Sequence, residues 1–330
     1  MKAVIVGYGS IGKRHLNNLL RIRDLEIVIC SKHKDSFALK LGCKIFNSLE
    51  SCLEEKPDIG FVTNPTSLHV ETAIKLANSG CHLFIEKPLS DSMRKVRTLL
   101  DIVRRKKLIT LMGCNLRFHP CIKKIKEIIE TNEIGRVISV KVENGSYLPD
   151  WHPYENYRQS YASRRDFGGG VVLTMIHEID YLYWLFGDIK EVCSITGKFS
   201  DLDIKTEDLS AILMRLKNNI IAEVHLDYFQ RPNFRSCKVI GTKGTIYWDS
   251  ESNTVEVYSI RKKRWIQKLK LENYDFNNTY IDEMNHFLKC INNRQKSIND
   301  IYQGEETLKI ALAIKKASKY KRTVPLNEKF

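Results

Sequence analysis

The sequence predicts an α/β protein of two domains, in which a doubly wound parallel sheet is followed by an α+β domain with a large, mostly antiparallel, open sheet. Three observations predict this class. The apolar strand 2–6 runs into the glycine turn Gly7-Tyr8-Gly9-Ser10-Ile11-Gly12. Strand and helix patterns then alternate as far as residue 113, which is typical of parallel βαβ units. Beyond residue 118 long alternating strands take over, and 330 residues are enough for two cores.

The first domain is predicted to cover residues 1–118. Its apolar runs predict parallel strands at 2–6, 25–31, 45–46, 58–63, 81–85 and 109–113. Helices are expected at 11–22, around the apolar positions Val70, Ala73, Ile74 and Ala77, and at 92–105. The carboxyl ends of these strands are therefore the expected ligand-binding edge.

The second domain is predicted to cover residues 119–330. A helix at 122–130 and an alternating strand at 137–144 are followed by a long polar loop, 145–167, which is rich in aromatic residues. Loops of this length are usually functional or disordered, and the aromatic side chains favour function. A helix is predicted at 170–186, strands between 192 and 269 with a hairpin turn at 241–244, and helices at 279–292 and 304–320. The sequence is also compatible with one terminal helix that packs back on the first domain.

Composition restricts the function classes. The formal charge of +14 comes from lysines spread along the whole chain, without a basic tail, so we expect a lysine-rich surface and no nucleic-acid partner. The nine cysteines form no CxxC pair or Cys/His cluster, so neither a disulfide framework nor a metal site is expected. No apolar run approaches the roughly 20 residues that span a bilayer. We therefore expect a cytoplasmic protein without a membrane partner.

The glycine turn predicts a dinucleotide-binding Rossmann fold. Gly7 permits the tight turn, Gly9 lets the backbone approach a pyrophosphate, and Gly12 lets the helix pack closely on the strand. Free N–H groups at Ser10 and Ile11 would then bind the phosphates. The alternative is a tight strand–helix turn without a ligand.

The end of the second strand favours NADP over NAD. An acidic residue there would accept hydrogen bonds from the ribose hydroxyls of NAD. This chain instead has Ser31 and Lys32, followed by His33 and Lys34. A hydroxyl and cations would accommodate a 2′-phosphate, although these lysines are also compatible with an ordinary solvated loop.

Further motifs follow at the ends of the later strands and after the aromatic loop. Asn64-Pro65 and His69 follow the fourth strand, and Glu86-Lys87-Pro88 follows the fifth. Asn115 and Arg117 come after the sixth strand, and Gly168-Gly169-Gly170 leads through Thr174 to His177. In order and spacing, these motifs resemble the Gfo/Idh/MocA family, named for glucose–fructose oxidoreductase and inositol dehydrogenase. The resemblance covers nearly the whole chain.

The resemblance implies roles for these residues. Lys87 would contact substrate and nicotinamide as the central catalytic residue, and the Lys-Pro bond is often cis in the family. Asn64, Pro65, His69, Glu86, Lys87 and Asn115 would line the cofactor. His177 would act as general acid and base. The Asp that usually precedes this histidine is replaced by Thr174, which cannot hold charge or accept a proton at neutral pH.

The substrate pocket is expected to involve the aromatic loop. Aromatic faces suit sugar rings, and arginines suit carboxylates or phosphates. The predicted substrate contacts are Lys87, Arg117, Tyr147, Trp151, Arg164, Thr174 and His177. We expect an oxidoreductase that transfers hydride between NADP or NAD and a sugar hydroxyl or ketone, with an acidic or nucleotide-linked sugar of surface-polysaccharide biosynthesis as one option. The loop is also compatible with an oligomer contact.

Two other functions are compatible with the same motifs. One is an NAD-dependent glycosidase, which oxidises its substrate transiently to break a glycosidic bond. The other is a dinucleotide-binding sensor without catalysis. In each case the family resemblance implies a homodimer or homotetramer.

Overall fold

The computed structural model describes residues 1–22, 24–32, 36–153 and 155–328. The chain divides into two compact units. Unit 1 comprises Met1–Cys114 and Asn277–Leu308, and unit 2 comprises Asn115–Phe276 and Lys309–Phe330. The predicted α/β class is confirmed, whereas the assignment of cofactor and substrate binding to separate domains stays a prediction. Among the described residues, no helix combines the length and apolar character needed to cross a membrane.

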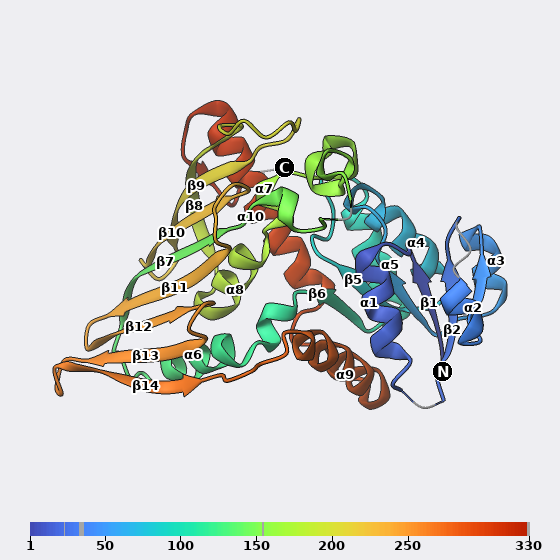
Figure 1. Cartoon of the computed structure of the whole chain (residues 1–330), viewed down its shortest axis with the longest axis horizontal. Helices are drawn as coiled ribbons and strands as arrows, with labels where there is room; N and C mark the ends of the chain where they lie inside the picture. The colour runs from blue at the N-terminus through green and yellow to red at the C-terminus, as the bar shows by residue number, and fades with distance from the viewer. Residues whose placement is uncertain (23, 33–35, 154, 329–330) are drawn as a thin grey trace. The chain divides into compact units, whose positions relative to one another are not determined.

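Unit 1 is built on a six-stranded parallel sheet (Figure 1). Its strands are β1 (Lys2–Val6), β2 (Glu26–Cys30), β3 (Lys44–Phe46), β4 (Ile59–Val62), β5 (His82–Glu86) and β6 (Thr110–Gly113). They follow the order β3-β2-β1-β4-β5-β6, with Val4 opposite Val28 on one side and Gly60 on the other. This is the doubly wound order: strands are added towards one edge of the sheet from β1 to β3, and towards the other edge from β4 to β6. The crevice outside that reversal point is where such sheets bind ligands.

Helices and short helical turns connect the strands of unit 1. They are α1 (Ser10–Leu19), α2 (Ser36–Lys40), α3 (Leu49–Glu54), η1 (Thr66–Leu68), α4 (His69–Asn78), α5 (Val96–Lys106) and α9 (Asn277–Asn293). Because βαβ crossovers are right-handed, α1, which connects β1 to β2, lies on one face of the sheet. Helices α4 and α5 connect β4 to β5 and β5 to β6 in the opposite direction along the sheet, so they lie on the other face. Helix α9 packs against α1. Helices α2 and α3 were not predicted from the sequence. Helix α5 begins four residues later than predicted, because Lys95 adopts a left-handed conformation just before it.

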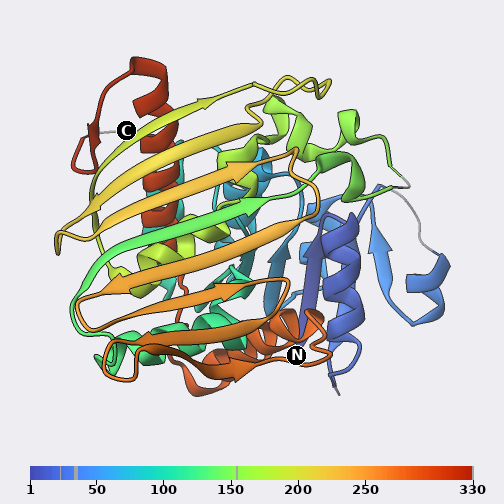
Figure 2. The same cartoon turned by 60° about the vertical axis from the view of Figure 1, so that its left-hand side comes forward.

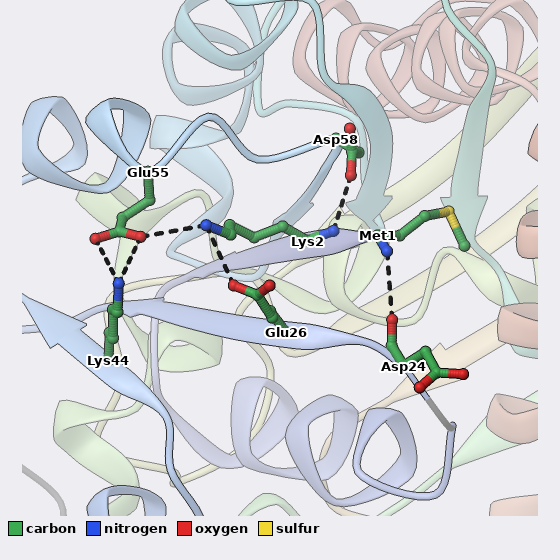
Figure 3. Close-up of polar contacts among 7 residues, drawn as sticks. All are labelled: Met1, Lys2, Asp24, Glu26, Lys44, Glu55 and Asp58. Atoms are coloured by element: carbon green, nitrogen blue, oxygen red, sulfur yellow. Dashed lines mark hydrogen bonds and ion pairs between the residues drawn. The ribbon is translucent and has the colours of Figure 1, made fainter.

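Charged side chains join the amino ends of four strands in unit 1 (Figure 3). The Lys2 ammonium lies 3.2 Å from the carboxylates of both Glu26 and Glu55, and the Lys44 ammonium lies 2.8 Å from Glu55. The backbone N–H of Lys2 donates to the Asp58 carboxylate at 2.8 Å. The two ammonium groups hold the pKa of Glu55 below its usual value, with Lys44 as the larger influence. These ion pairs occupy the edge of the sheet opposite the glycine turn.

Unit 2 is built on a nine-stranded sheet whose strands lie side by side in Figure 2. They follow the order β14-β13-β12-β11-β7-β10-β9-β8-β15, and the described pairs are antiparallel except β7 with β10. The strands are β7 (Val137–Gly145), β8 (Ile189–Gly197), β9 (Leu209–Leu216), β10 (Ile221–Asp227), β11 (Phe234–Gly241), β12 (Gly244–Asp249), β13 (Thr254–Ser259), β14 (Arg264–Lys270) and β15 (Val324–Pro325). The predicted mostly antiparallel sheet is confirmed.

Helices cover one face of the nine-stranded sheet. Helix α6 (Pro120–Glu130) packs against β13 and β14, and α8 (His177–Phe186) packs against β7. The second half of α10 (Ile301–Tyr320) reaches β8, where the Ser194 hydroxyl donates to the carbonyl of Ile314 at 2.6 Å. Side chains along β9 alternate between buried and exposed, as expected for a sheet with one covered face.

The segment before α8 differs from the sequence prediction. The expected helix 170–186 is two helices, α7 (Val171–Thr174) and α8, because Met175 leaves helical geometry with φ −95° and ψ 36°. His177 is therefore the first residue of α8. The preceding loop contains the short turns η3 (Leu148–Asp150), η4 (Tyr157–Gln159), η5 (Tyr161–Ser163) and η6 (Arg165–Phe167).

Candidate active site

The glycine turn has the backbone geometry that a bound dinucleotide requires. Gly7 adopts φ +102°, and a Cβ there would lie 2.4 Å from the backbone nitrogen of Asn64. A Cβ on Gly12 would lie 2.2 Å from the carbonyl oxygen of Gly7. No atom lies within 4 Å of a Cβ built on Gly9, so the backbone is open there. Gly7 and Gly12 therefore allow close packing, and Gly9 leaves room for a ligand.

The start of α1 supplies donors for an anion. Ser10 is exposed and Ile11 is half-buried, and both lie in the first turn, whose N–H groups have no partner within the helix. This turn has no acidic side chain. The residues thus fit the pyrophosphate of a dinucleotide, which would be held by backbone donors at the positive end of the helix dipole.

The end of β2 has no carboxylate at its first two loop positions. The backbone N–H of Ser31 donates to Phe46 in β3 at 2.9 Å, and the Lys32 side chain is exposed. His33 and Lys34 lie outside the described residues. Ser31 and Lys32 therefore directly follow β2, as the NADP prediction assumes, and that prediction stays a prediction.

The loops after β4 and β5 are held together by a buried histidine. His69 is 1% exposed, and its two ring nitrogens each lie 2.8 Å from a carbonyl oxygen, that of Asn64 on one side and that of Pro88 on the other. Burial keeps the pKa of His69 below its usual value. The predicted cofactor residues Asn64, Pro65 and His69 thus lie beside the Lys87 segment.

Asn64 also presents a buried acceptor. Its side-chain nitrogen donates to the Thr72 hydroxyl at 2.8 Å, whereas its Oδ1 has no hydrogen-bond partner within the part of the chain that the structure describes. A buried polar atom without a partner is costly, so an acceptor of this kind fits a site that is completed by a ligand.

Lys87 follows β5 directly. Its side chain is half-buried, and the Lys87-Pro88 peptide bond is cis. The Glu86 carboxylate accepts from the backbone N–H of Lys87 at 3.3 Å and lies 2.7 Å from Nε2 of the buried His15. Lys87 thus follows the carboxyl end of an interior strand, and its backbone N–H is hydrogen-bonded to a buried carboxylate.

The Glu86 carboxylate belongs to a group of three buried residues. His15, Glu86 and Glu283 bring their potential ligand atoms within 4.8 Å of one another, which is close enough to hold a metal ion. No metal site is expected from the sequence, because the three residues lie far apart in the chain and show no metal-ligand spacing.

Unit 2 contains Asn115 and Arg117, both in the short turn η2 (Asn115–Phe118) and both buried. The Arg117 guanidinium is 0% exposed and donates through Nε and Nη2 to the two oxygens of Asp180, each at 2.8 Å. Its face packs on the Trp184 ring. Asp180 therefore pairs with Arg117. The predicted contact of Arg117 with substrate stays a prediction, and the burial of its side chain weighs against that contact.

Tyr228 joins two of the predicted substrate residues in unit 2. Thr174 is 4% exposed, and its hydroxyl lowers the pKa of the buried Tyr228 phenol against the larger effect of burial. The Trp151 ring meets the Tyr228 ring edge-on at 5.4 Å, and its N–H donates to Ser146 at 2.9 Å. Burial raises the pKa of Tyr228 well above its usual value. Tyr228 was not predicted as a site residue, because it follows a strand and no sequence motif surrounds it.

The other predicted substrate residues have local partners. The Arg231 guanidinium lies 3.8 Å from the centre of the Tyr147 ring. Arg164 forms an ion pair with Asp166 and packs 3.8 Å from the centre of the Phe167 ring. His177 is half-buried at the start of α8. Thr174 and Trp151 thus meet through Tyr228, whereas Tyr147 and Arg164 have separate partners.

The sheet order and the glycine turn define unit 1 as a dinucleotide-binding Rossmann unit. Residues 1–114 match the family model described as "Oxidoreductase family, NAD-binding Rossmann fold", and residues 122–247 match the "GFO/IDH/MocA C-terminal domain". The chain belongs to the Gfo/Idh/MocA family of NAD-binding oxidoreductases. The family predicted from the motifs is confirmed.

Named relatives extend over most of the chain. A myo-inositol 2-dehydrogenase of Thermotoga maritima is 26% identical over 346 residues, covering 99% of each chain. The uncharacterized oxidoreductase YrbE of Bacillus subtilis is 29% identical over 319 residues, covering 89% of this chain and 87% of the relative. A levoglucosan dehydrogenase in complex with NADH and levoglucosan has a TM-score of 0.88 at 18% identity, covering 99% of this chain and 100% of that chain. The last likeness shows the shared fold alone.

Proposed function

We propose that this protein is an NAD(P)-dependent dehydrogenase or reductase that acts on a hydroxyl or ketone of a sugar or polyol. The observation that carries the proposal is the position of Lys87 directly after β5, in the same sheet whose β1 leads into the glycine turn. Both positions lie at the carboxyl edge, where such sheets bind their ligands. The names of the relatives, which include inositol and levoglucosan dehydrogenases, support a substrate of the sugar and polyol class.

In this proposal, Lys87 and His177 are the catalytic residues. The glycine turn and the loops after β4 and β5 would hold the nicotinamide cofactor, which would supply the hydride donor or acceptor. His177 accepts the hydroxyl proton during oxidation and returns it during reduction. The Lys87 ammonium donates a hydrogen bond to the same oxygen and stabilises the negative charge that develops on it. Thr174 contributes a hydroxyl to the site, so neither step depends on a carboxylate at that position.

For the substrate we propose an acidic or nucleotide-linked sugar, of the kind used in surface-polysaccharide synthesis. The loop that carries Trp151 and Arg164 supplies aromatic faces for a sugar ring and a cation for a carboxylate or phosphate. The Arg164 side chain is 42% exposed beside Asp166, so an anionic ligand can compete with that carboxylate for the guanidinium.

The first experiment measures turnover with a panel of polyols, neutral sugars, sugar acids and nucleotide sugars, by the absorbance of NADH or NADPH. On the best substrate, Lys87→Met and His177→Gln are expected to lower kcat by about 10²-fold or more, because each removes a group that acts on the reacting oxygen. Lys75→Met, which removes an exposed lysine paired with Glu50, is the control and should keep wild-type turnover.

Other outcomes would favour the alternatives. Release of the chromophore from a chromogenic N-acetylhexosaminide without net NADH would indicate the glycosidase. Cofactor binding that Lys87→Met leaves unchanged, with no turnover on any substrate of the panel, would indicate the sensor. Full turnover in both active-site variants would contradict the assigned roles.

For the cofactor we propose a preference for NADP, supported by Ser31 and Lys32 at the end of β2. Lys32→Glu should weaken NADPH binding by about tenfold while changing NADH binding much less, since the new carboxylate would repel only the 2′-phosphate. Calorimetric titration of each variant with both cofactors measures the difference. NADH binding that is tighter than NADPH binding in the unmodified protein would contradict the preference.

We propose that the protein acts in the cytoplasm as a homodimer or homotetramer, without a nucleic-acid or membrane partner. Apolar side chains such as Ile195 and Leu213, which are 66% and 54% exposed on β8 and β9, support pairing through the uncovered face of the nine-stranded sheet. Light scattering after size-exclusion chromatography would determine the oligomeric state.

A further inference from the structure

The residues on either side of Lys87, Glu86 and Pro88, are each within hydrogen-bond distance of a buried histidine of unit 1. On one side, Glu86 is 7% exposed, and its Oε1 lies 2.7 Å from Nε2 of His15 in α1. On the other side, the carbonyl of Pro88 lies 2.8 Å from Nδ1 of His69. Two buried histidines from different helices therefore contact the residues immediately before and after Lys87.

The His15 ring has only one polar partner among the described residues. It is 0% exposed and lies among the rings of Phe61, Phe84 and Tyr280, at centroid distances of 5.5, 4.8 and 6.2 Å. Its Nδ1 has no hydrogen-bond partner in the described part of the chain. A proton on Nδ1 would be a buried donor without an acceptor, which is costly. The ring therefore carries its proton on Nε2 and donates it to Glu86.

Both oxygens of Glu86 are then engaged. Oε1 accepts from His15, and Oε2 accepts from the backbone N–H of Lys87 at 3.3 Å. The carboxylate also packs against Gly113 in β6, where a Cβ would lie 2.9 Å from the nearer carboxylate oxygen. The side chain is thus enclosed by the neighbouring strand and held at both oxygens.

We propose that Glu86 and His15 are positioning residues for Lys87. Their hydrogen bonds connect α1, whose first turn forms the cofactor site, to the backbone of the catalytic lysine. The contact fixes the direction in which Lys87 leaves the sheet, while the His69 contact restrains the following residue. This inference rests on the catalytic role that the proposed function gives to Lys87.

A hydrogen bond explains the geometry of His15 and Glu86 better than a metal ion does. Two ligands of a tetrahedral zinc ion, each about 2.0–2.1 Å from the metal, are about 3.3 Å apart. Nε2 of His15 and Oε1 of Glu86 are 2.7 Å apart, which is the length of a charge-assisted hydrogen bond. Glu283 completes a possible ligand set, so the metal content of the protein is part of the test.

The test follows the Lys87 amine directly and needs no substrate. Lysines of the purified full chain are reductively dimethylated with ¹³C-formaldehyde and a borane reductant, and the Lys87 resonance is assigned by its loss in Lys87→Arg. Glu86→Gln leaves one side-chain oxygen to accept hydrogen bonds from both His15 and the Lys87 backbone N–H. His15→Leu removes the imidazole that donates to Glu86. Both variants should change the chemical shift of the Lys87 resonance, because the amine changes its surroundings.

Conservative variants separate positioning from a general loss of structure. His15→Gln keeps a donor near the position of Nε2, so the wild-type Lys87 resonance should return. Glu71→Gln, at an exposed carboxylate that pairs with Lys95, should leave it unchanged. Fluorescence titration with NADH should give affinities within about twofold of wild type for His15→Gln, which shows that the cofactor turn is intact. ¹⁵N spectra should show the Nε2–H form of His15.

Three results would overturn the proposal. They are a Lys87 resonance that is the same in Glu86→Gln and His15→Leu as in wild type, a proton on Nδ1 of His15, and one equivalent of bound metal that is lost in Glu283→Gln. These results are distinct from failure of the proposed function, which would appear as full turnover in Lys87→Met. An inactive Lys87→Met with an unresponsive Lys87 resonance would refute only the positioning role.

Discussion

At the residue scale, the Arg117–Asp180 pair of unit 2 shows how burial changes the meaning of a charged side chain. The guanidinium and the carboxylate are 0% and 1% exposed and form two parallel hydrogen bonds of 2.8 Å. Taking both charges out of water is costly, and only this geometry compensates for it. The pair thus joins η2 to α8, the helix that begins at His177, within unit 2.

Removing one partner of this pair should be much worse than removing both. Arg117→Met removes the guanidinium that compensates the buried Asp180 charge, so we expect the free energy of unfolding to fall by about 3–5 kcal/mol. Arg117→Met combined with Asp180→Leu should recover a large part of this loss. Urea denaturation, followed by the fluorescence of the nearby Trp184, measures both of these variants and the Asp180→Leu single variant. If the loss of unfolding free energy in the double variant equals the sum of the losses in the two single variants, the two residues are not coupled.

At the element scale, α6 begins with an unusual cap. His119 precedes the helix, and its Nδ1 accepts the backbone N–H of Cys121 at 3.3 Å. The ring is 2% exposed and lies beside Trp248 and Tyr274. Burial, followed by the charge of Arg235, lowers the pKa of His119 to about 4. Only the neutral ring can accept this hydrogen bond, so protonation would remove the cap.

The depressed pKa of His119 predicts a loss of stability in acid. The unfolded chain, with an ordinary histidine pKa near 6.5, binds the proton more tightly than the folded chain does. The stabilisation is therefore complete above about pH 6.5 and decreases as the pH falls towards 4, by about 3 kcal/mol in total. Denaturant unfolding between pH 8 and pH 4 measures this loss.

Asparagine provides the matched variant for that measurement. His119→Asn keeps a side-chain acceptor that suits a helix start but does not titrate, so its stability profile should be flatter between pH 6.5 and 4. His152→Asn, at a half-exposed histidine of the aromatic loop, should keep the wild-type slope. Equal slopes in His119→Asn and wild type would assign the acid sensitivity to other groups.

At the scale of the whole molecule, the chain returns to its first unit near the end. Residues 277–308 belong to unit 1, where Phe287 of α9 packs its ring edge against Phe61 and Phe84 at 6.4 and 5.8 Å. The segment after α9 extends along β6, and the backbone N–H of Met112 donates to Asn299 at 2.8 Å. Unit 1 is therefore discontinuous in sequence and contains a core helix from the C-terminal third of the chain.

Truncating Phe287 should destabilise unit 1 selectively. Phe287→Ala leaves a cavity beside Phe61 and Phe84 and should cost about 3–5 kcal/mol. Hydrogen exchange measured by mass spectrometry should become faster in peptides from β4 and β5, while peptides from β9 and β10 keep their rates. Phe199→Ala, at a side chain 59% exposed in unit 2, is the control. Uniformly faster exchange over both sheets would contradict two separate cores.

Much of unit 1 could be predicted because its signals are local. The glycine turn follows a strand within a few residues, and the period of the apolar side chains distinguishes strands from helices. Motif order alone predicted the family, which the family models confirm. The break at Met175 was missed because the largely apolar segment 171–176 is compatible with a continuous helix, and nothing local indicates where the helix ends.

The sequence by itself determined the two sheet types, the dinucleotide turn, the family and the positions of Lys87 and His177 in the chain. Only the tertiary structure decided that Glu86 faces His15, that Asp180 is held by Arg117, and that Tyr228 joins Thr174 to Trp151. The physical reason is distance along the chain. Turns and strands follow from neighbouring residues, whereas a buried polar side chain finds its partner only when distant segments pack together, and no spacing in the sequence records that pairing.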